Sequence, residues 1–117
     1  VLSIQDKVDY ICRALEAGFF VRLFFVCTES PTINAARIAN RVMEGGHDVP
    51  ITKIISRYQK SLLNCCLVAK LLDRVYVYDN SADDVDAKLL FRLTDGHMVK
   101  QYVDVIPEWV QLIQESI

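Results

Sequence analysis

The sequence predicts an α/β fold in which helices flank a sheet, and three observations predict it. Residues 19–27 are aromatic or apolar at almost every position, which is typical of a strand buried on both faces of a parallel sheet. Two amphipathic helical segments separate this run from a second apolar run at 74–78, the order that produces parallel neighbours. An Asp-Gly dipeptide at 95–96 lies between two alternating runs and predicts an antiparallel hairpin. We therefore expect a mainly parallel sheet with a C-terminal antiparallel hairpin.

Two helices are predicted before and after the first apolar run. Helical spacing of apolar residues predicts a helix over 3–17, where Ser3 and Asp6 resemble a capping box and Gly18 ends the helix. Ser30 precedes a proline and predicts the N-cap of a second helix, which runs over about 31–44.

The remaining elements follow from the same signals. Pro50 begins a longer helix that reaches about residue 71. The strands of the hairpin are predicted at 88–93 and 98–103. A final amphipathic helix begins at 106–108, with three side chains facing inward: Trp109, Leu112 and Ile113. No repeat or linker is visible, so residues 1–117 are expected to form a single domain.

Composition and charge exclude several classes of function. The chain is 52% hydrophobic with few Gly and Pro, so it is expected to fold rather than remain disordered. A formal net charge of −2 argues against a nucleic-acid coat, which normally carries a large cationic excess. The apolar runs at 19–27 and 62–72 are too short and too charged to span a bilayer. We expect neither a nucleic-acid nor a membrane partner.

The cysteines indicate a reducing compartment. They lie in apolar stretches without C-x-x-C spacing, so we interpret them as reduced core residues rather than as metal ligands or disulfides: Cys12, Cys27, Cys65 and Cys66. The start of the chain carries no secretion signal, so the expected location is the cytoplasm.

Two basic helix faces are the main candidates for chemistry. Arg37 and Arg41 share one face of the second helix with Asn34, and Arg57 lies on a similar face of the third helix. A Gly-Gly turn at 45–46 joins the two helices. Arginine offers planar, permanently charged donors that suit phosphate, so these helices could form a lid over a nucleotide. The alternative is that the charged stripes are solvated outer faces of amphipathic helices.

Other candidate sites are weak. His47, in the loop between these helices, is either a further phosphate ligand or an ordinary turn residue. The sequence has no nucleophile elbow, no metal-spaced His or Cys cluster and no G-x-x-x-x-G-K-[ST] loop. We assign no catalytic residue and no metal site.

The residues of this region resemble a known family. The run from 34 to 64, with Gly-Gly-His-Asp-Val-Pro at 45–50, and the run Asp-Arg-Val-Tyr-Val-Tyr-Asp-Asn-Ser at 73–81 are similar to the zeta-toxin-like group of P-loop proteins, the predicted ABC-type ATPases. The resemblance implies a P-loop kinase-like fold with lid helices at about 31–71, and a phosphotransferase that uses ATP, Mg²⁺ and a small-molecule phosphate acceptor. It also implies that lid arginines reach the ATP phosphates and that the loop after the second strand lies near the adenine. By motif position, the phosphate residues are Arg41 and Arg57, then Arg37 and His47, and the adenine-side residues are Asp79, Asn80 and Ser81.

The Walker A loop and catalytic acid of that family have no counterpart in this sequence. We therefore expect this chain to be the C-terminal lid and adenine-side portion of a kinase and to be inactive alone. The alternative is that the chain is a non-catalytic remnant that acts as a protein-interaction module. In related kinases the P-loop strand lies beside the strand that corresponds to 19–27. Its absence would leave an open edge, through which we expect the chain to self-associate or bind a partner.

Overall fold

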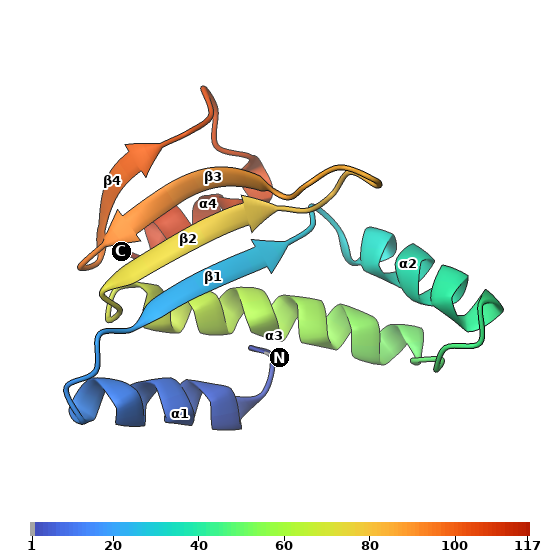
Figure 1. The fold of residues 1–117 in the computed structure, drawn as a ribbon, viewed down its shortest axis with the longest axis horizontal. Coiled ribbons are helices and arrows are strands. Elements are labelled where there is room, and N and C mark those ends of the chain that lie inside the picture. The colour runs from blue at the N-terminus through green and yellow to red at the C-terminus, as the bar shows by residue number, and fades with distance from the viewer. Residues whose placement is uncertain (1) are drawn as a thin grey trace.

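The computed structural model describes residues 2–117 and has an α/β fold (Figure 1). The elements, in chain order, are α1 Gln5–Glu16, β1 Arg22–Cys27, α2 Pro31–Met43, α3 Ile51–Ala69, β2 Arg74–Asp79, β3 Lys88–Thr94, β4 His97–Gln101 and α4 Glu108–Glu115. Each element lies within a few residues of its predicted position. Helices flank the sheet, as the sequence predicted.

The sheet is mixed, with strand order β1-β2-β3-β4. β1 runs parallel to β2, whereas β2 with β3 and β3 with β4 are antiparallel. The expectation of a mainly parallel sheet was therefore wrong. Helices α2 and α3 provide the long crossover that a parallel pair needs, but the loop between β2 and β3 contains no helix and returns the chain antiparallel.

The predicted C-terminal hairpin is confirmed. Asp95 and Gly96 both have positive φ, 51° and 78°, as the two central residues of a type I′ turn require. Thr94 and His97 pair across this turn. The turn is also held to the rest of the domain, because the Asp95 N–H donates to the Asp73 carbonyl at 3.0 Å.

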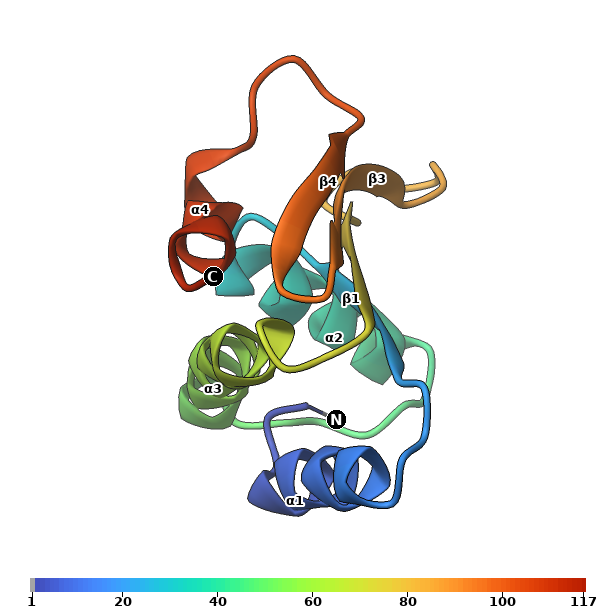
Figure 2. The same cartoon turned by 90° about the vertical axis from the view of Figure 1, so that its left-hand side faces the viewer.

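The core lies on one side of the sheet, where α3 and α4 pack, while α1 lies beside α3 (Figure 2). The fully buried side chains include residues of α3 and α4, one residue just after α3, and alternate positions of β2 and β3: Val68, Leu72, Val75, Val77, Phe91, Leu93, Val110 and Ile113. Leu112, predicted to face inward, is 44% exposed, because the buried face of α4 follows the i, i+3 spacing of Val110 and Ile113.

The burial of β1 also differs from the prediction. Phe25 is buried, but Phe20, Phe24 and Val26 are more than half exposed. The strand is therefore covered on one face only, because α3 and α4 lie on the same side of the sheet and no described helix covers the other. β1 is also the edge strand that the sequence led us to expect.

Helix ends confirm one predicted cap and correct another. The Ser30 hydroxyl accepts the Thr32 N–H at 3.1 Å, with proline at the first helical position of α2. In contrast, the N-cap of α1 is Ile4, without a side-chain cap, so Ser3 does not form the expected capping box. Gly46 donates its N–H to the Arg41 carbonyl at 2.7 Å and closes α2 in a Schellman motif with Gly45.

Candidate functional site

The carboxyl ends of the two parallel strands meet at one edge of the sheet. Cys27 and Asp79 are register partners there, and the Asn80 N–H donates to the Cys27 carbonyl at 2.7 Å. From this point the chain leaves β1 towards α2 and leaves β2 in the loop towards β3. In α/β sheets, ligands bind outside the carboxyl ends of parallel strands, so this edge is a candidate binding site.

The predicted adenine-side residues form a tied turn at this edge. The Asp79 carboxylate accepts the Ser81 N–H at 2.8 Å and also the Ser81 hydroxyl. The Ser81 oxygen in turn accepts the Glu29 N–H at 2.8 Å, which links the loops after β1 and β2. The side chains of Asp79 and Ser81 thus hold the turn, whereas Asn80 lines the adjacent hollow.

A buried polar residue, Thr28, joins this edge to the helices α2 and α3. The Thr28 hydroxyl lies 2.8 Å from Asn34 Oδ1 on α2 and 3.0 Å from the Ser30 carbonyl. The Tyr58 hydroxyl on α3 donates to the Thr28 carbonyl at 2.7 Å. Burial raises the pKa of Tyr58 to about 12, with smaller contributions from Cys27, Glu29 and Asp79, so Tyr58 stays a neutral donor.

Arg37 and Arg41 lie one turn apart on α2 and face this edge. They line a hollow of about 300 Å³ together with Thr28, Asn34 and Asn80. Arg37 is held by the loop after β2, because its guanidinium forms an ion pair with Asp83 at 3.2 Å. Within residues 2–117 this is the only ion pair, so Arg41 has no carboxylate partner within 4.0 Å. Arg41 is therefore the arginine available to an anion.

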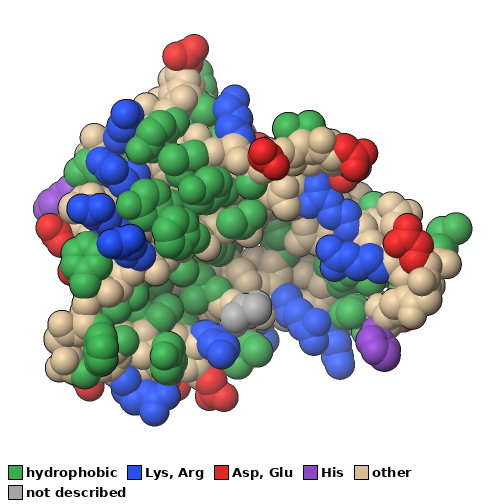
Figure 3. All heavy atoms as spheres, viewed as in Figure 1, with side chains coloured by type: hydrophobic (Ala, Val, Ile, Leu, Met, Phe, Trp, Pro, Cys, Tyr) green, Lys and Arg blue, Asp and Glu red, His purple; other side chains and the backbone are tan. Residues whose placement is uncertain are grey.

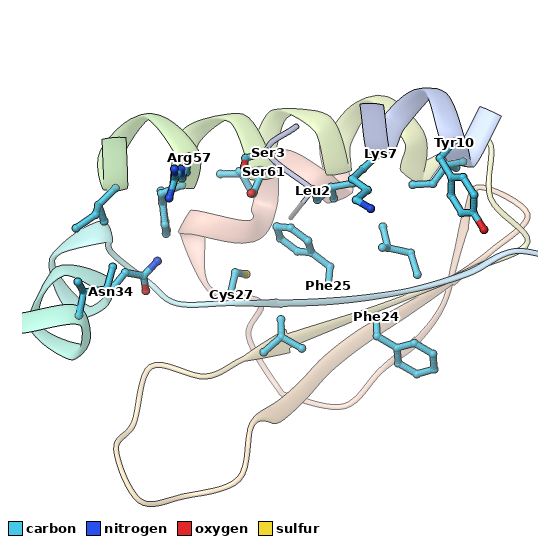
Figure 4. A pocket seen from close by; sticks show the side chains of 17 residues that line it. Leu2, Ser3, Lys7, Tyr10, Phe24, Phe25, Cys27, Asn34, Arg57 and Ser61 are labelled. Carbon is cyan, nitrogen blue, oxygen red and sulfur yellow. The ribbon is translucent and has the colours of Figure 1, made fainter. Parts of the chain in front are cut away.

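A larger hollow of about 590 Å³ lies between β1 and the helices α1 and α3. Figure 4 shows Arg57 from α3 and Asn34 from α2 at one end of it, and Lys7 and Tyr10 from α1 at the other. Four residues line both hollows: Val26, Cys27, Asn34 and Ile38. Arg41 and Arg57 thus line neighbouring hollows that share part of their lining.

The fourth predicted phosphate residue lies apart. His47 is exposed in the loop between α2 and α3 and lines none of the hollows described for residues 2–117. The sequence reasoning also did not single out Thr28 and Tyr58 as parts of the site. Their signal was weak, because a residue after a strand and a tyrosine within a helical apolar stripe are both common in cores.

Two carboxylates at this edge are already engaged and are not free to act as magnesium ligands. Mg²⁺ prefers carboxylate ligands, but Asp79 is bonded to Ser81 and Asp83 is paired with Arg37. Within the described part of the chain, no three His, Cys, Asp or Glu side chains are grouped to hold a metal ion. The Cys27 thiol is poorly suited to act as a nucleophile, because burial raises its pKa to about 12.

Comparisons of the chain with protein-family models, curated proteins and solved structures found no match. The resemblance to the zeta-toxin-like group therefore rests on the motif residues alone. No helix among residues 2–117 has the length and apolar character that a membrane span requires.

Proposed function

We propose that this chain is the lid and adenine-side portion of a zeta-toxin-like, ATP-dependent small-molecule phosphotransferase and that it does not turn over alone. The observation that carries the proposal is the gathering of Arg41, Asn34 and Asn80 around one hollow at the carboxyl ends of β1 and β2. Arg41 and Asn80 both belong to the runs that resemble the family. They are 39 positions apart in the sequence, and the fold brings them to one hollow.

The geometry supports a division of roles among these residues. Arg41, free of a carboxylate, would hold phosphate oxygens by charge-assisted hydrogen bonds. Asn80, on the tied turn after β2, would lie towards the base. Arg57, in the neighbouring hollow, would reach the phosphates from α3. Electrostatic stabilisation of this kind assists phosphoryl transfer but needs a phosphate-binding loop and a positioned acceptor. Without those parts, binding of ATP should be weak.

The proposed location of the protein is the cytoplasm. All four cysteines are free thiols in the structure. A reducing cytoplasm suits them, since secreted domains of this size usually carry disulfides.

Isothermal titration calorimetry with ATP and with tripolyphosphate tests the proposal. We expect millimolar binding that Arg41→Gln weakens by roughly 10- to 100-fold, since a hydrogen bond to a charged group contributes about 1.5–3 kcal/mol. Lys53→Gln is the matched control, because it removes the same charge from an exposed position that lines no described hollow. Equal affinities for the parent and Arg41→Gln would refute the proposal, as would micromolar binding that requires Mg²⁺.

A second candidate, the non-catalytic interaction module, is favoured by the open edge of β1. The carbonyls of Val21 and Cys27 accept hydrogen bonds from Arg74 and Asn80, so the odd-numbered residues of β1 face β2. The N–H and C=O groups of Arg22, Phe24 and Val26 therefore point to the free edge. The other edge strand, β4, is shorter and carries His97 and Lys100, which discourage pairing.

For this candidate, the partner is a second copy of the chain, with β1 paired antiparallel to β1 about a two-fold axis near Phe24. This arrangement sets Arg22 opposite Val26 and keeps the two arginines apart. Sedimentation velocity over a concentration series should show a dimer that Phe24→Lys dissociates. Leu67→Lys, an equal change at an exposed site on α3, should leave the dimer intact. A monomeric parent protein at all concentrations would exclude self-association through this edge.

A further inference from the structure

The face of the sheet that no described helix covers has an unusual composition. We call it the outer face and define it by the side chains that alternate with the core positions of the strands. Two cross-strand rows run over it, Arg22–Arg74–Thr94 and Phe24–Tyr76–Arg92–Lys100. Figure 3, which views this face, shows apolar side chains over the strands with a band of Lys and Arg beside them. The outer face thus combines rings and cations.

The phenylalanine rings of the outer face are accessible, and the Tyr76 ring beside them is half-buried. Phe24 and Tyr76 stack with their centroids 4.8 Å apart and their planes within 6°. Phe24 remains 55% exposed and Phe20 59% exposed. The guanidinium groups of Arg22 and Arg74 lie 5.5 and 5.6 Å from the Phe20 centroid. These rings are in contact with water, so a ligand that stacks on them gains free energy by burying their apolar surface.

The cations of the outer face lack anionic partners. Within residues 2–117, Arg22, Arg74, Arg92 and Lys100 form no ion pair within 4.0 Å. Arg92 also has a buried Nε without an acceptor. A hydrogen bond from Arg74, together with the charges of Arg74, Arg92 and Arg22, lowers the pKa of Tyr76, so these cations act on the same ring. The net charge of −2 hides this local excess of positive charge.

We propose that the outer face binds single-stranded nucleic acid, with bases stacked on Phe24 and Tyr76 and phosphates held by Arg22, Arg74 and Lys100. Charge complementarity selects a polyanion, and the exposed rings select one with unpaired aromatic bases. A duplex keeps its bases stacked internally and would engage only the cations. A four-stranded sheet with helices on one face and aromatic residues on the other is also an architecture that RNA-binding modules use.

This site is separate from the one proposed above. Arg22 and Arg74 begin β1 and β2, whereas Asn80 follows the opposite ends of the strands and Arg41 projects from α2. Neither proposal depends on the other. Arg41→Gln should leave oligonucleotide binding unchanged, and Tyr76→Ala should leave tripolyphosphate binding unchanged.

Fluorescence anisotropy with labelled oligothymidylate of about ten nucleotides, within the usual site size, tests the proposal at low salt. We expect Tyr76→Ala and Phe24→Ala each to weaken binding by roughly 5- to 100-fold, and Tyr76→Phe to retain it. Arg74→Gln should make the slope of log K against log salt concentration less steep by about one, as expected for the loss of one phosphate contact. Lys53→Gln, an exposed cation on α3 that lines no described hollow, is the charge-matched control. The urea midpoint of each variant shows whether it is folded, and Phe24→Ala is an exposed-site variant that serves if Tyr76→Ala unfolds.

Four outcomes would overturn the proposal. The first is the absence of binding by the parent protein at low salt. The second is binding that Arg74→Gln weakens but both ring variants leave unchanged, since it would show charge attraction without stacking. The third is equal competition by a duplex of the same length. The fourth is a dimer that buries the outer face, shown by protection of Tyr76 from iodination in the free protein.

Discussion

Replacement of Gly96 by alanine should destabilise the protein through two separable terms. Gly96 has a φ of +78°, and a Cβ there would lie 2.8 Å from the Lys70 carbonyl oxygen at the end of α3. Gly45 has a φ of +95° but open space around the added Cβ. Gly45→Ala therefore measures the cost of a strained backbone alone, whereas Gly96→Ala measures a strained backbone together with a close contact.

The magnitudes follow from these two terms. A left-handed conformation costs alanine about 1–2 kcal/mol, offset by about 0.4–1 kcal/mol because alanine lowers the entropy of the unfolded chain. We therefore expect Gly45→Ala to cost about 1 kcal/mol. The contact at Gly96 adds an overpacking cost of about 1–3 kcal/mol, because Lys70 presents backbone rather than a movable side chain there. Gly96→Ala should cost about 2–4 kcal/mol.

Urea denaturation measures both values from the midpoint, provided the m-value is unchanged. Asparagine separates the two terms, because it adopts positive φ more readily than alanine but also carries a Cβ. Gly45→Asn should recover most of the loss at that position, whereas Gly96→Asn should recover little. If Gly96→Ala costs no more than Gly45→Ala, the hairpin turn does not press on the end of α3, and the reasoning fails.

Three further predictions concern the core, the thiols and Tyr58. Phe91→Ala should lower the free energy of unfolding by about 3–5 kcal/mol in urea, whereas Phe24→Ala should change it little, because Phe91 is fully buried and Phe24 is exposed. Burial raises the pKa of Cys27 and Cys65, so Ellman's reagent should label both more slowly in the folded than in the unfolded protein, and equal rates would contradict their burial. The pKa of Tyr58 is raised from 10.0 to about 12, so the folded state holds this proton more tightly, and its stabilising contribution is complete below pH 10 and lost as the pH rises to 12. Urea midpoints across this range should fall less for Tyr58→Phe than for the parent protein, and parallel curves would count against the shift.

The elements were predictable because their signals are local. Ser30 with its following proline, and Asp95 with Gly96, fix a helix start and a hairpin turn through backbone geometry that few other residues supply. The direction of β3 and the burial of β1 were not predictable in the same way. They depend on whether a connection contains a helix and on which side of the sheet the helices pack. An apolar run such as 19–27 is compatible both with a strand covered on one face and with a strand covered on both faces.

The site was predictable in part for a similar reason. Helical spacing placed Asn34, Arg37 and Arg41 on one face, and the structure puts them beside one hollow. Spacing does not show which charged groups neutralise one another across the fold. The ion pair of Arg37 with Asp83 joins residues 46 positions apart, and the location of His47 away from the hollows depends on the path of an exposed loop.

The contrast between Arg37 and Arg41 decides which of them is the better anion ligand. Arg37 donates from Nε and Nη2 to the Asp83 carboxylate and from Nη2 to the Ala82 carbonyl at 3.4 Å, so a phosphate would have to displace an existing partner. Arg41 carries no such cost, although it shares a hollow of about 420 Å³ with the acidic loop at 82–86. A negative loop beside a cationic pair weakens the attraction for free anions in general. Under the proposed function, a nucleotide would offset this repulsion through contacts of its base with Asn80, which lines the same hollow.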